Sequence, residues 1–193
     1  MILKKFGLSF LSFLLFTFIF CFEAYSEPNF NKEQILVEDL VNYKTQKGSV
    51  KMTFWVDAPL EKVWTLLVEY DRWTEFMPDL EKIEIREKNN NSAIVYVKAK
   101  TPMNLDIWYL IKRNYDKKNN KITWDFLEGK AKDVEGSWQI FQVNQNLCKL
   151  VYINYVDLGF GIPQNIVNLV TKNKLPNLAN GIKRYLKNNL KNL

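Results

Sequence analysis

The residue types that usually carry catalysis are mostly missing from this chain. Histidine does not occur among the 193 residues. Ser-His-Asp and Cys-His catalysis and histidine-containing zinc sites are therefore excluded, and the commonest general base near neutral pH is absent. Acid–base chemistry would have to use Tyr109 or carboxylates, and these residues form no identifiable cluster in the sequence. We expect neither a metal nor a redox cofactor.

One charged residue, Arg113, is expected on the inner face of a strand. Alternation along that strand turns Asp106 and Lys112 to solvent and Arg113 inward. An inward guanidinium could bind a ligand head group or pair with a buried carboxylate. Arg113 is also expected at a strand end, from which its side chain could curl out to solvent, and the sequence alone favours this second interpretation.

A series of strands must position these side chains. Apolar and polar residues alternate along most of the chain, and short polar turns separate the alternating stretches, which predicts an antiparallel meander. The first stretch, 35–43, could also form a short helix, and we expect a turn at 46–49. The predicted strands are 35–43, 50–56, 80–87, 92–100, 104–113, 121–127, 134–143 and 147–156.

Two short helices and one long helix are expected beside the strands. The first covers 59–70, and a second short helical turn ends before Pro78. Apolar residues at helical spacing predict a long helix over 163–190, which at about 1.5 Å per residue would be roughly 40 Å long and bent at Pro176. The inner stripe of the first helix is expected to be Val63, Leu66, Leu67 and Tyr70.

The arrangement of these elements predicts the fold class. An antiparallel sheet with one wet face must cover its other face, and the two short helices are too small for that. The long helix is the natural cover. We therefore predict an α+β fold, in which a strongly curved antiparallel sheet wraps around the long C-terminal helix and two short helices after an early strand close one end.

The first 26 residues are typical of a signal peptide. Two lysines precede an apolar run over 6–22, and Ala24-Tyr25-Ser26 fits a small-x-small cleavage site. We expect an exported protein, periplasmic or secreted, with one domain over 27–193; the alternative is an uncleaved membrane anchor. Without the signal, Cys148 is the only cysteine, so no internal disulfide can form.

The charge pattern indicates which partners fit. The chain has 27 basic and 21 acidic residues; the signal holds two lysines and one glutamate, so the rest carries 25 against 20, a formal +5. The lysines are spread out without a dense block. This distribution is compatible with transient contact with an anionic membrane surface but does not indicate nucleic acid. We expect a monomer.

The junction between the last strand and the long helix resembles a known family. Gly136 and Trp138 add a Gly-x-Trp strand, and 41–85 resembles the opening strands and helices of the same family, the START lipid-transfer domains, which include the steroidogenic acute regulatory protein. Leu105-Asp106 stands where many members have an Arg-Asp pair, and the wider helix-grip superfamily also includes coenzyme-Q-binding and polyketide cyclase-like proteins. The junction residues that carry the resemblance are Asp157, Leu158, Ile162, Pro163, Ile166, Asn168 and Val170.

The resemblance implies an elongated apolar cavity between sheet and helix, which is the usual place for a ligand. From composition alone, the same inward residues would fill a dry core. Phe160, between two glycines, could act as a hinge for ligand entry or form an ordinary strand-to-helix turn. The residues expected to line the cavity are Val95, Val97, Ile107, Tyr109, Ile111, Arg113, Trp124, Phe126, Trp138 and Ile140 from the sheet, with Ile166, Val170 and Leu178 from the helix.

From these expectations we predict that the protein is a non-catalytic carrier. The protein is expected to bind one hydrophobic molecule, a lipid, sterol or isoprenoid, and to carry it or shield it from water outside the cytoplasm. Two alternatives stay open. One is a polyketide cyclase or aromatase-like enzyme that uses the same cavity, and the other is a protein-interaction module with a collapsed cavity.

Overall fold

A computed structural model describes residues 31–41, 47–70, 73–77, 79–100, 106–159 and 161–190. The expected signal over 1–26 and the expected hinge residue Phe160 lie outside this part. Within the described ranges, no helix is both long and apolar enough to cross a membrane.

The described residues form one antiparallel sheet of eight strands in the order β1-β2-β8-β7-β6-β5-β4-β3. Every predicted strand is present, and the helical alternative for the first one is wrong, because its residues pair with β2. The strands β1 and β3 form the two edges. The bounds are β1 Leu36–Val41, β2 Gly48–Val56, β3 Leu80–Lys88, β4 Ser92–Ala99, β5 Ile107–Asp116, β6 Lys121–Gly129, β7 Asp133–Asn144 and β8 Leu147–Asp157.

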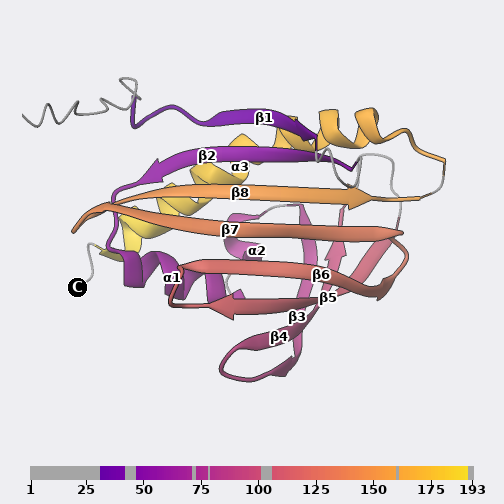
Figure 1. Ribbon diagram of the computed structural model, residues 1–193, viewed down its shortest axis with the longest axis horizontal. Helices are drawn as coiled ribbons and strands as arrows, with labels where there is room; N and C mark the ends of the chain where they lie inside the picture. Colours follow the sequence, from indigo (N-terminus) through magenta and orange to yellow (C-terminus); the bar gives the residue numbers. More distant parts are fainter. Residues whose placement is uncertain are drawn as a thin grey trace, which may run out of the picture. The chain divides into compact units, whose positions relative to one another are not determined.

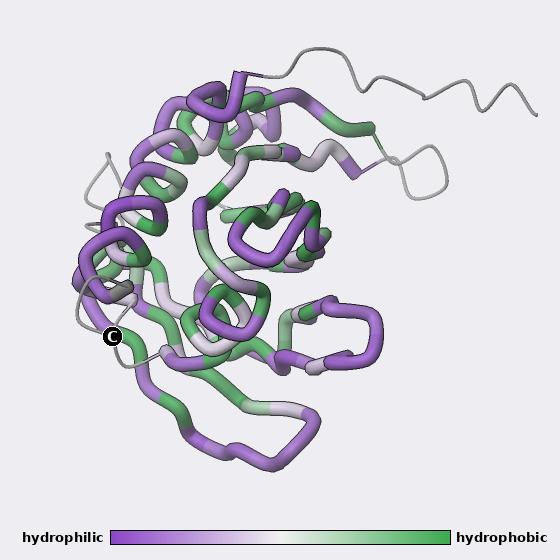
Figure 2. Tube along the Cα trace, turned by 90° about the vertical axis from the view of Figure 1, so that its left-hand side faces the viewer, coloured by the Kyte–Doolittle hydropathy of each residue, from purple (hydrophilic) through white to green (hydrophobic). Residues whose placement is uncertain are grey.

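The long helix α3 (Gln164–Leu190) lies across one face of the sheet. It contacts β1, β2 and β8, and Figure 1 shows it behind these strands. Apolar residues recur along the helix between hydrophilic ones, so that one side can pack on the sheet (Figure 2). Pro176 lies inside it, as predicted. The fold class is therefore confirmed: a curved antiparallel sheet around a long C-terminal helix.

Two short helices, α1 (Leu60–Val68) and α2 (Trp73–Phe76), follow β2. The members of the predicted inner stripe are all buried in the core, but α1 ends before Tyr70, which it was predicted to include. The second helix packs closely against α3: a Cβ added at Gly181 would lie 2.5 Å from the backbone oxygen of Phe76. Only glycine permits this approach.

Most strand boundaries differ from the prediction by one to three residues, and two of the differences affect the argument. The expected turn at 46–49 is wrong in its second half, because Gly48 and Ser49 belong to β2 and pair with β1. The fifth strand was predicted to end at Arg113 but continues to Asp116, since Asn114 pairs with both β4 and β6. Arg113 consequently lies inside a central strand and not at its end.

Candidate ligand cavity

A cavity lies between the inner face of the sheet and the chain around α2. Its volume is about 80 Å³. That is room for several water molecules, but it is less than the roughly 300 Å³ of an ordinary small-molecule site. The walls are Tyr70, Trp73, Met77, Leu80 and Ile83 from the α1–β3 region, Val95, Val97, Tyr109, Ile111 and Arg113 from β4 and β5, and Trp124, Val134, Trp138, Tyr152 and Asn154 from β6 to β8.

Arg113 is buried in this cavity, with 2 % of its surface exposed. Its guanidinium carbon lies 4.0 Å from the ring centre of Tyr70, 5.2 Å from that of Trp73 and 5.6 Å from that of Trp124. The Nη2 atom donates a hydrogen bond of 3.2 Å to the backbone oxygen of Leu67. The interpretation that Arg113 curls out to solvent is therefore wrong, because β5 continues past it and both neighbouring strands pair there.

Burial shifts the titration of the groups in the cavity. Loss of hydration lowers the pKa of Arg113 to about 9, so the guanidinium is still charged at neutral pH. The same cause raises the pKa of Tyr109 to about 12 and raises the pKa of Tyr152 as well. Both phenols therefore stay protonated. No carboxylate is found among the described residues that line the cavity.

Among the described residues, several buried polar atoms have no hydrogen-bond partner, and all but the Tyr115 hydroxyl belong to residues of the cavity wall. They are the Nε of Arg113, the Nε1 of Trp138 and the hydroxyls of Tyr70 and Tyr115. Buried donors are nearly always paired in native proteins, because an unpaired one keeps the full cost of losing water. Their concentration here indicates a place where a molecule with acceptor oxygens would be stabilised.

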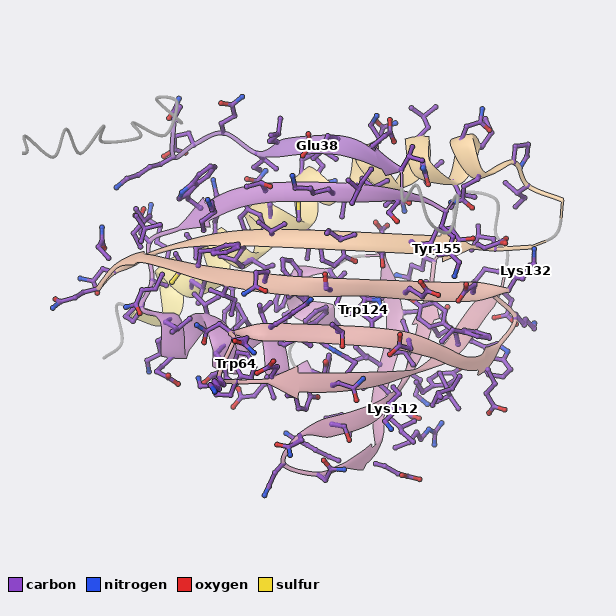
Figure 3. All side chains as sticks on the ribbon, in the orientation of Figure 1. Glu38, Trp64, Lys112, Trp124, Lys132 and Tyr155 are labelled. Atoms are coloured by element: carbon purple, nitrogen blue, oxygen red, sulfur yellow. The ribbon has the colours of Figure 1, made fainter. Side chains whose placement is uncertain are left out.

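Aromatic packing fixes the floor of the cavity. Trp124, near the middle of the sheet in Figure 3, stacks on Tyr152 with ring centres 5.6 Å apart, and Trp138 lies 4.4 Å from the same Tyr152 ring. Gly136 pairs with Trp124 across β6 and β7, and a Cβ at Gly136 would lie 2.2 Å from the indole. Gly136, the glycine of the Gly-x-Trp pattern, thus lets Trp124 lie over the backbone of the neighbouring strand β7.

The structure brings some of the predicted residues to the cavity and places others elsewhere. From the sheet, Ile107, Phe126 and Ile140 pack in the core and are not in its wall. Leu178 of α3 is also a core residue. The predicted residues found in the wall are Val95, Val97, Tyr109, Ile111, Arg113, Trp124 and Trp138.

The sequence reasoning missed the contribution of the α1–β3 region. Trp73 and Met77 line the cavity, although no residue of this helical turn was predicted to do so, and no residue of α3 does. Trp73 is oriented by a hydrogen bond of 3.1 Å from its Nε1 to the backbone oxygen of Leu66. The cluster of large apolar residues at 73–77, just before Pro78, was the one signal that could have indicated this wall.

A second, apolar groove of about 420 Å³ lies beside the first half of α3. Ile166 and Val170, which were expected in the main cavity, line this groove. Across it, Lys174 of α3 forms an ion pair of 2.8 Å with Asp79, next to the start of β3. Its remaining walls are Ala99, Lys100, Val156, Leu158, Ile162, Val167 and Thr171.

Within the part of the chain that the structure describes, no three histidine, cysteine, aspartate or glutamate side chains are grouped so that they could hold an ion. What the cavity offers is an apolar, aromatic space with one buried positive charge and unpaired donors. Such a space can bind and orient a molecule.

The sequence matches one family model. Residues 56–183, more than half of the chain, match the family described as polyketide cyclase / dehydrase and lipid transport. A search of curated proteins found no match.

Several solved structures have a similar fold. The Zhui aromatase/cyclase from a Streptomyces species superposes with a TM-score of 0.66 at 18% identity, covering 74% of this chain and 94% of that chain. For a STAR-related lipid transfer protein from Xanthomonas axonopodis the TM-score is 0.66 at 14% identity, with 79% and 93% covered. For human StAR-related lipid transfer protein 5 it is 0.63 at 12% identity, with 80% and 82% covered. At these identities the likeness concerns the fold.

Proposed function

The chain belongs to the family of polyketide cyclase / dehydrase and lipid-transport proteins, and we propose that it binds one hydrophobic molecule in the cavity behind α2. The START resemblance of the sequence is confirmed at the level of family and fold. The observation that carries the proposal is an apolar, aromatic cavity in which buried donors stand without partners. Burial of ligand surface at about 25 cal/mol per Å² would drive binding without a covalent step.

The proposed role is non-catalytic. A cyclase that uses acid–base chemistry needs a group that gains or loses a proton near neutral pH. Burial moves the pKa of Tyr109 to about 12, away from neutrality, and the described wall contains no carboxylate. These features favour a carrier of a lipid, sterol or isoprenoid. The export expected from residues 1–26 would place this carrier outside the cytoplasm, in transient contact with membranes.

A whole lipid needs more space than this cavity offers. Its volume of about 80 Å³ is too small for a whole lipid. Uptake of a whole lipid would therefore displace side chains or the short helix α2, unless most of the lipid lies outside this cavity. A protein-interaction module with a permanently collapsed cavity is the outcome to be excluded.

The test is to express the full precursor, purify the protein under non-denaturing conditions and analyse it by native mass spectrometry with organic extraction. A small molecule bound at one copy per chain is expected, either directly or after incubation with mixed membrane lipids. Val97→Phe, which fills the cavity, should lose this molecule. Val143→Phe, at a side chain that is 53% exposed, should retain it. A protein that stays empty after incubation would contradict the proposal, and turnover of a polyketide-like substrate would indicate the enzyme.

A further inference from the structure

The cavity carries a positive charge that no described side chain balances. Arg113 is charged at neutral pH, and its described neighbours in the wall are apolar, aromatic or amide side chains. An unpaired buried charge is costly, and an anion that arrives with a ligand would remove that cost. The unpaired Nε–H of Arg113 is the type of donor that forms charge-assisted hydrogen bonds with carboxylates.

We infer that the ligand is a single-chain amphiphile with a carboxylate head group, that the carboxylate lies against Arg113, and that the chain extends into the groove beside α3. This inference rests on the proposed function and specifies the ligand class of the same cavity.

The aromatic rings around Arg113 do not replace such an anion. Tyr70, Trp73 and Trp124 lie against the guanidinium at ring-centre distances of 4.0 to 5.6 Å and stabilise its charge. Ring faces, however, supply no acceptor oxygen for the Nε–H of the guanidinium. Among the described residues, the guanidinium donates one hydrogen bond, from Nη2 to the backbone oxygen of Leu67, and its Nε has no partner. A carboxylate would complete the set of partners.

The small volume of the cavity selects a compact head group. About 80 Å³ accommodates a group the size of a few water molecules. A carboxylate fits this space, whereas a phospholipid head group with its glycerol and esters does not. The cavity is also too small for the apolar chain of the same ligand, which must therefore lie elsewhere.

The groove beside α3 is the adjoining apolar space. Asn154 lines the cavity and Val156 lines the groove, and the two residues lie on the same face of β8, about 7 Å apart. Leu80 lines the cavity and its neighbour Asp79 lines the groove. A chain that starts at Arg113 and follows the inner face of β8 therefore enters the groove, whose volume of about 420 Å³ lies within the usual range for small-molecule sites.

Calorimetry with three probes of equal chain length tests the inference: dodecanoate, dodecan-1-ol and dodecyltrimethylammonium. The two ions are used below their micelle concentrations and the alcohol below its solubility limit. We expect the wild-type protein to bind dodecanoate about tenfold or more tightly than the alcohol, as for a charge-assisted hydrogen bond, and the cation most weakly. Arg113→Met should bind dodecanoate and the alcohol equally. Lys112→Met removes the same formal charge from the exposed neighbour (Figure 3) and should keep the wild-type ratio.

The outcomes separate this inference from the proposed function. Equal binding of dodecanoate and dodecan-1-ol by the wild-type protein would overturn the carboxylate and leave the carrier intact, and so would a preference that survives in Arg113→Met. Absence of binding by all three probes would overturn both. If Arg113→Met does not fold, the ratio of dodecanoate affinity to dodecan-1-ol affinity is measured for the wild-type protein at pH 8 and pH 10. Loss of the guanidinium charge should make this ratio about tenfold lower at pH 10, and an unchanged ratio would overturn the inference.

Discussion

Burial of Arg113 without an anion makes a prediction about stability and pH. Its pKa is about 9 in the folded protein, below its ordinary value in the unfolded chain. Above pH 9 the unfolded state therefore holds more protons than the folded state, and this group makes the free energy of unfolding rise with pH. One unit above the folded pKa, at pH 10, the gain relative to pH 8 is about 1.4 kcal/mol.

The assay compares urea unfolding of the ligand-free wild-type protein and Arg113→Met at pH 8 and pH 10. The difference in unfolding free energy between the two proteins should shift by about 1.4 kcal/mol in favour of the wild type at the higher pH. Burial raises the pKa of Tyr109, Tyr115 and Tyr152 in the folded protein, and the charge of Arg113, which is present in the wild type only, lowers the pKa of Tyr115 and Tyr152. Lys112→Met should behave as the wild type.

A difference that does not change between pH 8 and pH 10 would refute the reasoning, because Arg113 would then keep its charge in the folded state through a counter-charge of the protein itself. Bound dodecanoate supplies such a counter-charge from outside. With a saturating amount of it, the shift between the two pH values should disappear.

Further predictions concern the walls of the two spaces. Gly136→Ala should lower the free energy of unfolding by about 1–3 kcal/mol in urea titrations, because the new methyl group meets the Trp124 indole at 2.2 Å; no loss would show that the indole can move aside. Val170→Trp should weaken dodecanoate binding about tenfold in calorimetry, because the indole displaces about two methylenes of the ligand, at roughly 0.8 kcal/mol each. Binding of the shorter hexanoate should stay unaffected. Leu169→Trp, at a position 55% exposed on the same helix, should change the binding of neither ligand. Lys174→Met should change the free energy of unfolding by less than about 1 kcal/mol, because its ion pair is exposed; a larger loss would mean that the pair closes the groove.

The periodicity of the sequence was sufficient to predict the architecture. Alternation placed Val95, Val97 and Ile111 inward because a strand has a fixed period of two, and the burial of all three confirms it. Helical spacing in 163–190 likewise predicted the long helix. These patterns are local, and the short turns account for the order of the strands from β3 to β8. The pairing of β2 with β8 joins segments far apart in the sequence, so local patterns do not predict it.

The position of the cavity was not predictable in the same way. Periodicity identifies the inward residues, but it does not say which of them meet side chains and which meet space. Ile166 and Val170 were assigned to the cavity with Arg113, yet they line the neighbouring groove. Trp73 forms the part of the cavity wall that was expected from α3. The burial of Arg113 was also misjudged, because it depends on where β5 ends, and strand ends are the least certain part of a sequence-based prediction.

The contact between Gly181 and Phe76 couples the long helix to the cavity mechanically. α3 supplies no described residue to the cavity wall, but it supports the backbone of α2, whose Trp73 forms part of that wall. A contact this close can transmit a displacement of α3 to α2. If an incoming chain pushes the N-terminal half of α3 outward, the C-terminal half of α3 moves with it and shifts α2. Filling the groove would therefore loosen the cavity wall at Arg113. Entry of the apolar chain into the groove would then make room for the carboxylate beside Arg113.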